Sequence, residues 1–154
     1  MKIKNKKAMA LLLLAGCVAA GYWCWLCLRP VEIVAVHEED NHASVLVKNF
    51  PFTDKGKINW WLKNKNFMKE KYNIPKPSLS GSFTIIFWLF GYGYKEAGKY
   101  DRRCFDDMKT KVNCIDKNAV FAIRQYQDDD IIFATYEGRY LLTKGQNIIK
   151  DSFD

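Results

Sequence analysis

The polar segment from His37 to His42 holds the residue types best suited to chemistry in this chain. His37 and His42 are the only two histidines, and Glu38, Glu39 and Asp40 lie between them. Imidazole nitrogens and carboxylate oxygens are common metal ligands. However, their spacing matches no standard ligand set, and a solvated turn uses the same residue types. We therefore interpret this segment as the turn of a hairpin and predict no metal site.

Two adjacent carboxylates, Asp106 and Asp107, could act as a general acid and base. Three basic residues are close to them in sequence, Arg102, Arg103 and Lys109, so we expect surface ion pairs instead. No segment supplies a nucleophile together with a base and a residue that orients it. We therefore predict a binding protein without a cofactor. The alternative is a cell-envelope enzyme, which a deep polar pocket lined by these aspartates or the histidines would favour.

Two further motifs are incomplete versions of ligand-binding loops. Gly91, Gly93 and Gly98 do not form the glycine fingerprint that precedes a helix in dinucleotide sites. The three aspartates at 128–130 lack the later glycine and glutamate of a calcium loop. We predict a turn at each place.

The five cysteines form two groups. Cys17, Cys24 and Cys27 lie in an apolar run, where a thiol behaves as a small hydrophobic group and no second pair completes a redox or zinc site. Cys104 and Cys114 are the only cysteines after that run, and an oxidising compartment would pair them. We predict a structural disulfide, which would stabilise the fold by roughly 2–3 kcal/mol.

The apolar run itself extends from residue 8 to residue 28. A basic tail at 1–7 precedes it with four lysines, and Arg29 follows it. At about 1.5 Å per residue, a helix of this length spans a bilayer of roughly 30 Å. The lysines predict a cytoplasmic N-terminus, and in a bacterium with two membranes this places residues 30–154 in the periplasm, anchored to the inner membrane.

A lipoprotein is the alternative form of anchor. Leu14-Ala15-Gly16-Cys17 matches a bacterial lipobox, so residues up to 16 would be a cleaved signal and Cys17 would carry the lipid. Such a protein, with Val18 after its modified cysteine, would be expected in the outer membrane. The apolar residues that continue to Leu28 favour an uncleaved transmembrane helix.

The positive net charge of the chain indicates its orientation in the membrane, and it says little about the kind of ligand that the domain binds. The chain carries a net charge of +7, but five basic residues and no acidic ones lie in the first 29 positions. The remaining residues hold 19 basic side chains (24 − 5) and all 17 acidic ones. This near balance does not favour nucleic-acid binding, which needs a basic surface on the folded domain.

Residues 30–154 are enough for one modest domain, and their pattern predicts an α+β fold. Short β-branched or apolar runs predict strands at 31–36, 43–47, 82–90, 119–126, 131–136 and 139–143, with a last strand near 147–149. Asp54 is placed to cap a helix that runs to about Tyr72, before Pro75 and Pro77. We expect one mainly antiparallel sheet with a packed helix, and a central strand at 82–90 covered on both faces.

The expected helix is rich in lysine and carries the only surface for which we predict a function. Its apolar residues recur on one face, at Ile58, Trp61, Leu62, Met68 and Tyr72. Its lysines are at 55, 57, 63, 65, 69 and 71. The candidate docking surface for anionic headgroups or an acidic partner consists of Trp60, Lys63, Lys65 and Phe67. The alternative is an ordinary amphipathic helix with solvated lysines and Trp60 packed beside the core.

Three segments of the chain resemble a known family. They are Arg29 to His37 (RPVEIVAVH), Lys48 to Trp61 (KNFP and TDKGKINWW), and Cys104 to Ile115 (CFDDM and NCI). Together with the basic, leucine-rich start, they resemble an enterobacterial family of small membrane proteins of unknown function along nearly the whole chain. The resemblance implies a short envelope protein anchored at its N-terminus, and it implies no reaction, cofactor or catalytic residue.

The sequence thus predicts a membrane-tethered periplasmic domain that binds a partner. The expected partners are the lipid bilayer and an unidentified envelope protein. Two roles agree with this prediction: an accessory subunit of an envelope complex, and a guard protein that neutralises a toxin at the inner membrane.

Overall fold

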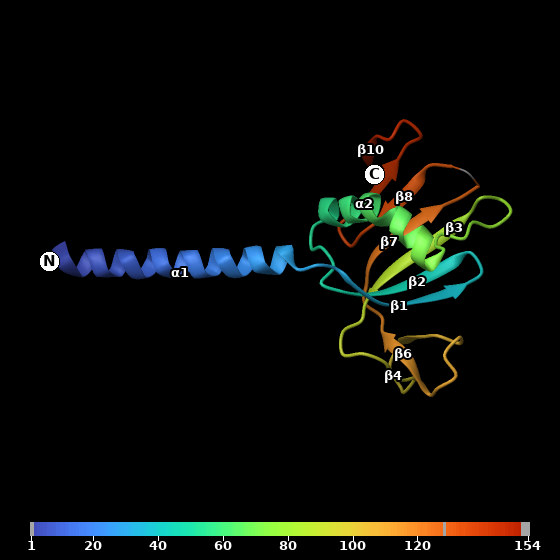
Figure 1. The fold of residues 1–154 in the computed structure, drawn as a ribbon, viewed down its shortest axis with the longest axis horizontal. Coiled ribbons are helices and arrows are strands. Elements are labelled where there is room, and N and C mark those ends of the chain that lie inside the picture. The colour runs from blue at the N-terminus through green and yellow to red at the C-terminus, as the bar shows by residue number, and fades with distance from the viewer. Residues whose placement is uncertain (1, 128, 152–154) are drawn as a thin grey trace. The chain divides into compact units, whose positions relative to one another are not determined.

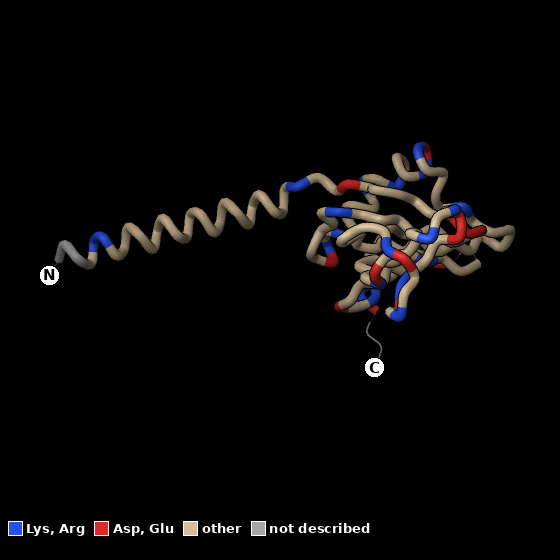
Figure 2. Tube along the Cα trace, turned by 90° about the horizontal axis from the view of Figure 1, so that it is seen from below, with Lys and Arg blue, Asp and Glu red and all other residues tan. Residues whose placement is uncertain are grey.

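The computed structural model describes residues 2–127 and 129–151, and the chain forms two compact units. The first unit, up to Pro30, consists of the helix α1 (Lys2–Leu28). Its segment Asn5–Leu28 is long and apolar enough to cross a membrane. Figure 2 shows no charged residue along most of this helix. The lysines of the predicted basic tail belong to the first turns of this helix and do not precede it.

The second unit begins at Val31 and is α+β, as predicted. Its elements are β1 (Glu32–Glu39), β2 (His42–Lys48), α2 (Asp54–Tyr72), β3 (Phe83–Leu89), β4 (Lys95–Glu96), β5 (Arg102–Cys104), β6 (Val112–Asp116), β7 (Ala119–Gln125), β8 (Ile131–Ala134), β9 (Arg139–Leu142) and β10 (Ile148–Asp151).

Seven strands form the main sheet, in the order β1-β2-β3-β7-β8-β9-β10. Every neighbouring pair is antiparallel except β2 and β3, which run parallel because α2 connects them as a crossover. The mainly antiparallel sheet with one packed helix is confirmed. The strand expected at 82–90 is central, between β2 and β7.

Helix α2 covers one face of this sheet (Figure 1). The helix contributes Ile58, Trp61 and Met68 to the core beneath it. Alternate residues of the strands point to the same core, for example Ile85 and Phe87 of β3, because side chains of a strand alternate between its two faces. The apolar face predicted for this helix is confirmed.

The start of α2 corrects the predicted cap. Thr53, not Asp54, is the N-cap, and its hydroxyl accepts a hydrogen bond from the backbone N–H of Gly56. The buried Asp54 carboxylate instead accepts hydrogen bonds from the hydroxyls of Thr135 (2.9 Å) and Tyr140 (2.7 Å). Asp54 therefore ties the helix to β9 and the turn before it.

The first hairpin also differs from the prediction. β1 continues to Glu39 and β2 begins at His42, so the turn consists of Asp40 and Asn41 alone. Asp40 takes a positive φ of 54°, a conformation that aspartate and asparagine tolerate better than most residues. His37 is consequently a strand residue, paired across from Ser44, and not part of a solvated turn.

Residues 90–118, which we call the insert, separate two neighbouring strands of the main sheet, β3 and β7. The insert contains a small sheet in the order β4-β6-β5, which the sequence analysis missed. Phe105 and Ile115 of the insert are buried against Leu46 of β2. Because Leu46 points away from the α2 side, the insert covers part of the opposite face of the main sheet.

Candidate functional site

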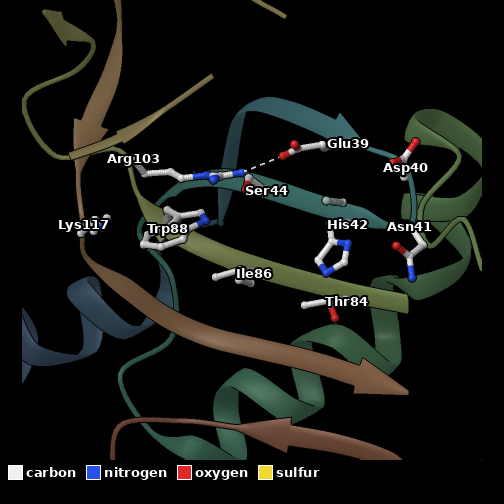
Figure 3. A pocket seen from close by; sticks show the side chains of 11 residues that line it. Glu39, Asp40, Asn41, His42, Ser44, Thr84, Ile86, Trp88, Arg103 and Lys117 are labelled. Carbon is white, nitrogen blue, oxygen red and sulfur yellow. Dashed lines mark hydrogen bonds and ion pairs between the residues drawn. The ribbon is translucent and has the colours of Figure 1, made fainter. Parts of the chain in front are cut away.

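The outer face of the main sheet is the face opposite α2. A cleft of about 530 Å³ lies on this face, where the insert does not cover it. Figure 3 shows the side chains that line it. They come from the β1–β2 hairpin, from β3 and from the insert: Glu39, Asp40, Asn41, His42, Ala43, Ser44, Thr84, Ile86, Trp88, Arg103 and Lys117.

The floor of the cleft is the outer face of β3. Thr84, Ile86 and Trp88 alternate with the buried residues of this strand and are spaced along it in Figure 3. The prediction that this strand is covered on both faces is therefore wrong, because the insert leaves these three side chains partly exposed. The indole N–H of Trp88 is buried and has no hydrogen-bond acceptor among the described residues, so a ligand or water oxygen would satisfy it.

The rim of the cleft carries charges of both signs. Arg103 of β5 lies 3.2 Å from the carboxylate of Glu39 in β1, which links the two walls at one point. Lys117, at the end of the insert, lies 2.5 Å from Asp101. These ion pairs are partly exposed, so a ligand can compete for either cation at little cost. The cleft thus offers an apolar floor, hydroxyl groups and charged groups of both signs.

Beside the cleft, His37 of β1 contacts three residues of the insert. Its Nδ1 lies 2.7 Å from the carboxylate of Asp107, and its Nε2 lies 2.8 Å from the hydroxyl of Tyr94. Its ring stacks on Phe105 with centroids 3.9 Å apart. Because His37 belongs to β1 and the other three residues to the insert, this group, which we call the clasp, holds the insert on the sheet.

The order carboxylate, imidazole, hydroxyl in the clasp resembles a catalytic relay, but the environment favours a structural role. If Nδ1–H donates to Asp107, the neutral imidazole accepts from the Tyr94 hydroxyl, so both ring nitrogens of His37 are used within the protein. Burial, and secondarily the charge of Asp107, raise the pKa of Tyr94 above its ordinary value. Its phenol therefore stays protonated and is a poor nucleophile.

The clasp corrects the predicted ion pairing of Asp107. Asp107 pairs with His37 instead of with the neighbouring Arg102, Arg103 or Lys109. Arg102 instead contacts Asp116. A smaller hollow of about 180 Å³ adjoins the cleft, and its lining includes both histidines and both aspartates of the sequence analysis: His37, His42, Asp106 and Asp107. No local pattern indicated that these residues meet, because His37 and Asp107 are 70 residues apart in the chain.

Among the described residues, no three His, Cys, Asp or Glu side chains are placed to hold one metal ion. His42 lies on the same face as His37 but is exposed as the first residue of β2. Gly91 and Gly93 form a turn with positive φ angles of 54° and 93°. Asp128, in the aspartate run, lies outside the described residues.

The two cysteines of the second unit are at disulfide distance. Cys104 and Cys114 face each other directly across the β5–β6 pair. A covalent bond there would hold Arg103 and Phe105, the neighbours of Cys104, in place at the cleft and the clasp. The oxidation state in the cell stays a prediction, and so does modification of Cys17, which is exposed in α1.

The four residues of the predicted docking surface are not equivalent in the structure. Trp60 is partly buried, with its ring centroid 5.3 Å from that of Phe50 and 5.8 Å from that of Phe87. Phe67 is exposed, and Lys63 and Lys65 are exposed as well. Trp60 therefore belongs mainly to the edge of the core, while the lysines and Phe67 remain available to a partner.

Comparison with known proteins gives a family but no characterised relative. A family model described as "Enterobacterial putative membrane protein (DUF943)" matches residues 2–152. No curated protein matches the chain, and no solved structure matches it. The geometry of the cleft therefore carries the functional argument by itself.

Proposed function

The chain belongs to the family of enterobacterial putative membrane proteins, and we propose that it is a membrane-anchored binding protein whose cleft takes a segment of another envelope protein. An N-terminal apolar helix fits membrane anchoring. The excess of lysines at the N-terminal end of this helix supports a cytoplasmic N-terminus and a periplasmic domain at the inner membrane.

The cleft is the observation that carries this proposal. Ligand sites are typically concave, with an apolar surface and a few polar groups that orient the ligand. Here Ile86 and Trp88 supply apolar contact, Thr84 supplies a hydroxyl, and Arg103 and Glu39 supply charges of opposite sign. A polypeptide offers apolar side chains, backbone amides and both kinds of charge, so its chemistry matches this lining.

An accessory subunit of an envelope complex is the role that agrees best with such a site. A guard protein that neutralises a toxin would use the same cleft, and the identity of the bound protein separates the two roles. Either role requires that the cleft, rather than the lysines of α2, contacts the partner.

Site-specific photocrosslinking in growing cells tests this requirement. A benzophenone amino acid replaces Ile86 on the cleft floor, and in a matched variant it replaces the exposed Lys65 on α2. We expect a discrete crosslinked product from position 86. The same product should disappear when Arg103→Glu is added, because this change reverses the charge at the rim.

Two results would contradict the proposal. A discrete product from position 65 without one from position 86 would move the binding surface to α2. A product from position 86 that persists unchanged with Arg103→Glu would indicate contact that does not depend on the cleft.

A further inference from the structure

Three loops at one end of the main sheet carry aromatic side chains that are mostly exposed. Phe52 precedes α2 and is 68% exposed, Tyr92 follows β3 and is 95% exposed, and Tyr136 lies between β8 and β9 and is 97% exposed. A single exposed aromatic residue needs no explanation, but three on separate loops at one end of a sheet form a surface.

The strand register places all three loops at the same end of the main sheet. The first residue of β1, Glu32, pairs with the last of β2, Lys48. The end of β2 lies beside the end of β3, because these strands are parallel. The end of β8 pairs with the start of β9 and with the middle of β7, and β7 begins beside the end of β3. The loops after β2, β3 and β8 therefore lie at the end of the main sheet where β1 begins (Figure 1).

The start of β1 is also the point where the domain joins its anchor. Only three residues, 29–31, separate the end of α1 at Leu28 from the start of β1 at Glu32. Fully extended, three residues span roughly 10 Å. If α1 crosses the bilayer, the end of the sheet that carries Phe52, Tyr92 and Tyr136 cannot move far from the lipid headgroups.

The last turns of α1 have the features of a membrane–water boundary. Tyr22, Trp23 and Trp25 are exposed on the helix, and the Arg29 guanidinium lies 4.3 Å from the ring centre of Trp25. Aromatic and basic side chains gather at this depth in membrane proteins, because their apolar parts enter the acyl boundary while their polar atoms stay hydrated.

We propose that Phe52, Tyr92 and Tyr136 insert into the lipid interface of the membrane that α1 crosses. The partner is the lipid bilayer itself, which accepts the phenyl ring among the acyl chains and the phenol hydroxyls among the headgroups. This contact would hold that end of the sheet against the membrane. The β1–β2 turn at Asp40 and Asn41, where the cleft opens, would then face away from the membrane.

Fluorescence quenching in the full-length protein tests this contact. Cys17, Cys24 and Cys27 are changed to serine, and one cysteine is placed at position 52, 92 or 136 for a polarity-sensitive fluorophore. Matched controls carry the cysteine at Leu79 or Tyr126, which are also exposed but lie in loops at the opposite end of the sheet. The proteins are reconstituted into phosphatidylethanolamine–phosphatidylglycerol vesicles that contain lipids with nitroxide headgroups.

We expect strong quenching and blue-shifted emission at 52, 92 and 136, and neither effect at 79 or 126. Circular dichroism of each labelled protein in the same vesicles checks that the fold is retained. Equal quenching at the two ends of the sheet, or quenching absent from any of the three aromatic positions, would overturn the proposal.

Discussion

The carboxylate of Asp107 and the Nδ1 atom of His37 lie 2.7 Å apart and join the insert to the edge strand of the main sheet. On the same face of the sheet, Glu39 and Arg103 make a second link between β1 and the insert. The wall of the cleft is thus attached to the sheet by side chains as well as by packing. This arrangement explains how a segment with little regular structure can form one wall of the cleft.

The clasp should contribute measurably to stability. His37→Ala removes two hydrogen bonds and the stack on Phe105, and it leaves the Tyr94 hydroxyl without this partner. We expect the free energy of unfolding to fall by about 1–3 kcal/mol, measured by denaturant titration of the detergent-solubilised protein. His42→Ala is the matched control and should change it by less than about 0.5 kcal/mol, because His42 is exposed. Equal effects of the two changes would mean that the clasp is not a structural element.

Trp60 should behave as a core residue. Trp60→Ala removes contacts with Phe50 and Phe87, so we expect a loss of about 2–3 kcal/mol in the free energy of unfolding, somewhat less than for a fully buried ring. Lys63→Glu together with Lys65→Glu should leave it within about 0.5 kcal/mol, because both lysines are exposed. If Trp60→Ala is harmless, the ring is free and the docking surface predicted on α2 gains support.

The insert contains an acid whose titration reports its local structure. A hydrogen bond from Lys95, with a further contribution from Arg102, lowers the pKa of Asp116 below its ordinary value of 3.8. The folded-state pKa is lower than the unfolded-state pKa. The ionised Asp116 carboxylate therefore stabilises the fold at pH values above the unfolded-state pKa. The contribution is lost as the pH falls through the folded-state pKa. Lys95→Met should raise the pKa towards 3.8 in a carboxyl-carbon NMR titration, whereas Lys99→Met should leave it unchanged.

The anchor can be identified from its chemistry. If α1 is an uncleaved transmembrane helix, the protein keeps its N-terminal residues, runs at full mass, and is unaffected by Cys17→Ser. Mass spectrometry of the protein from membranes measures this directly. Labelled palmitate that is incorporated into the protein, and lost with Cys17→Ser, would instead establish the lipoprotein.

The side of the membrane and the redox state of the insert can be tested together. An alkaline phosphatase fused after Asp154 should be active, since this enzyme works only in the periplasm. Cys104 and Cys114 should resist alkylation until a reductant is added. Free thiols at both positions, in membranes prepared under alkylating conditions, would contradict the disulfide or the periplasmic location.

Local patterns were sufficient to predict most of the main sheet and the packed helix. The spacing of Ile58, Trp61 and Met68 revealed the buried face of α2, because that spacing follows directly from the geometry of a helix. The strands of the insert could not be predicted from the sequence, because they are short and polar, as in Lys95–Glu96. Their pairing is determined by distant partners and not by local preference.

The candidate site was harder to predict than the fold. Thr84, Ile86 and Trp88 read as part of one apolar strand, and nothing local indicates that the insert leaves them partly uncovered. His37 was assigned to a turn because the polar residues after it suggested an early end to the strand. Its bonds to Asp107 and Tyr94 depend on where the insert returns to the sheet, which no short segment encodes.

The points where the insert leaves and rejoins the sheet are adjacent, since the backbone N–H of Leu89 donates to the carbonyl of Asn118 at 2.9 Å. The rest of the insert is therefore one long loop that connects the neighbouring antiparallel strands β3 and β7. The entropic cost of closing a loop rises only slowly with its length. A change in the length or sequence of this loop would therefore reshape the wall of the cleft while the sheet and the anchor stay the same.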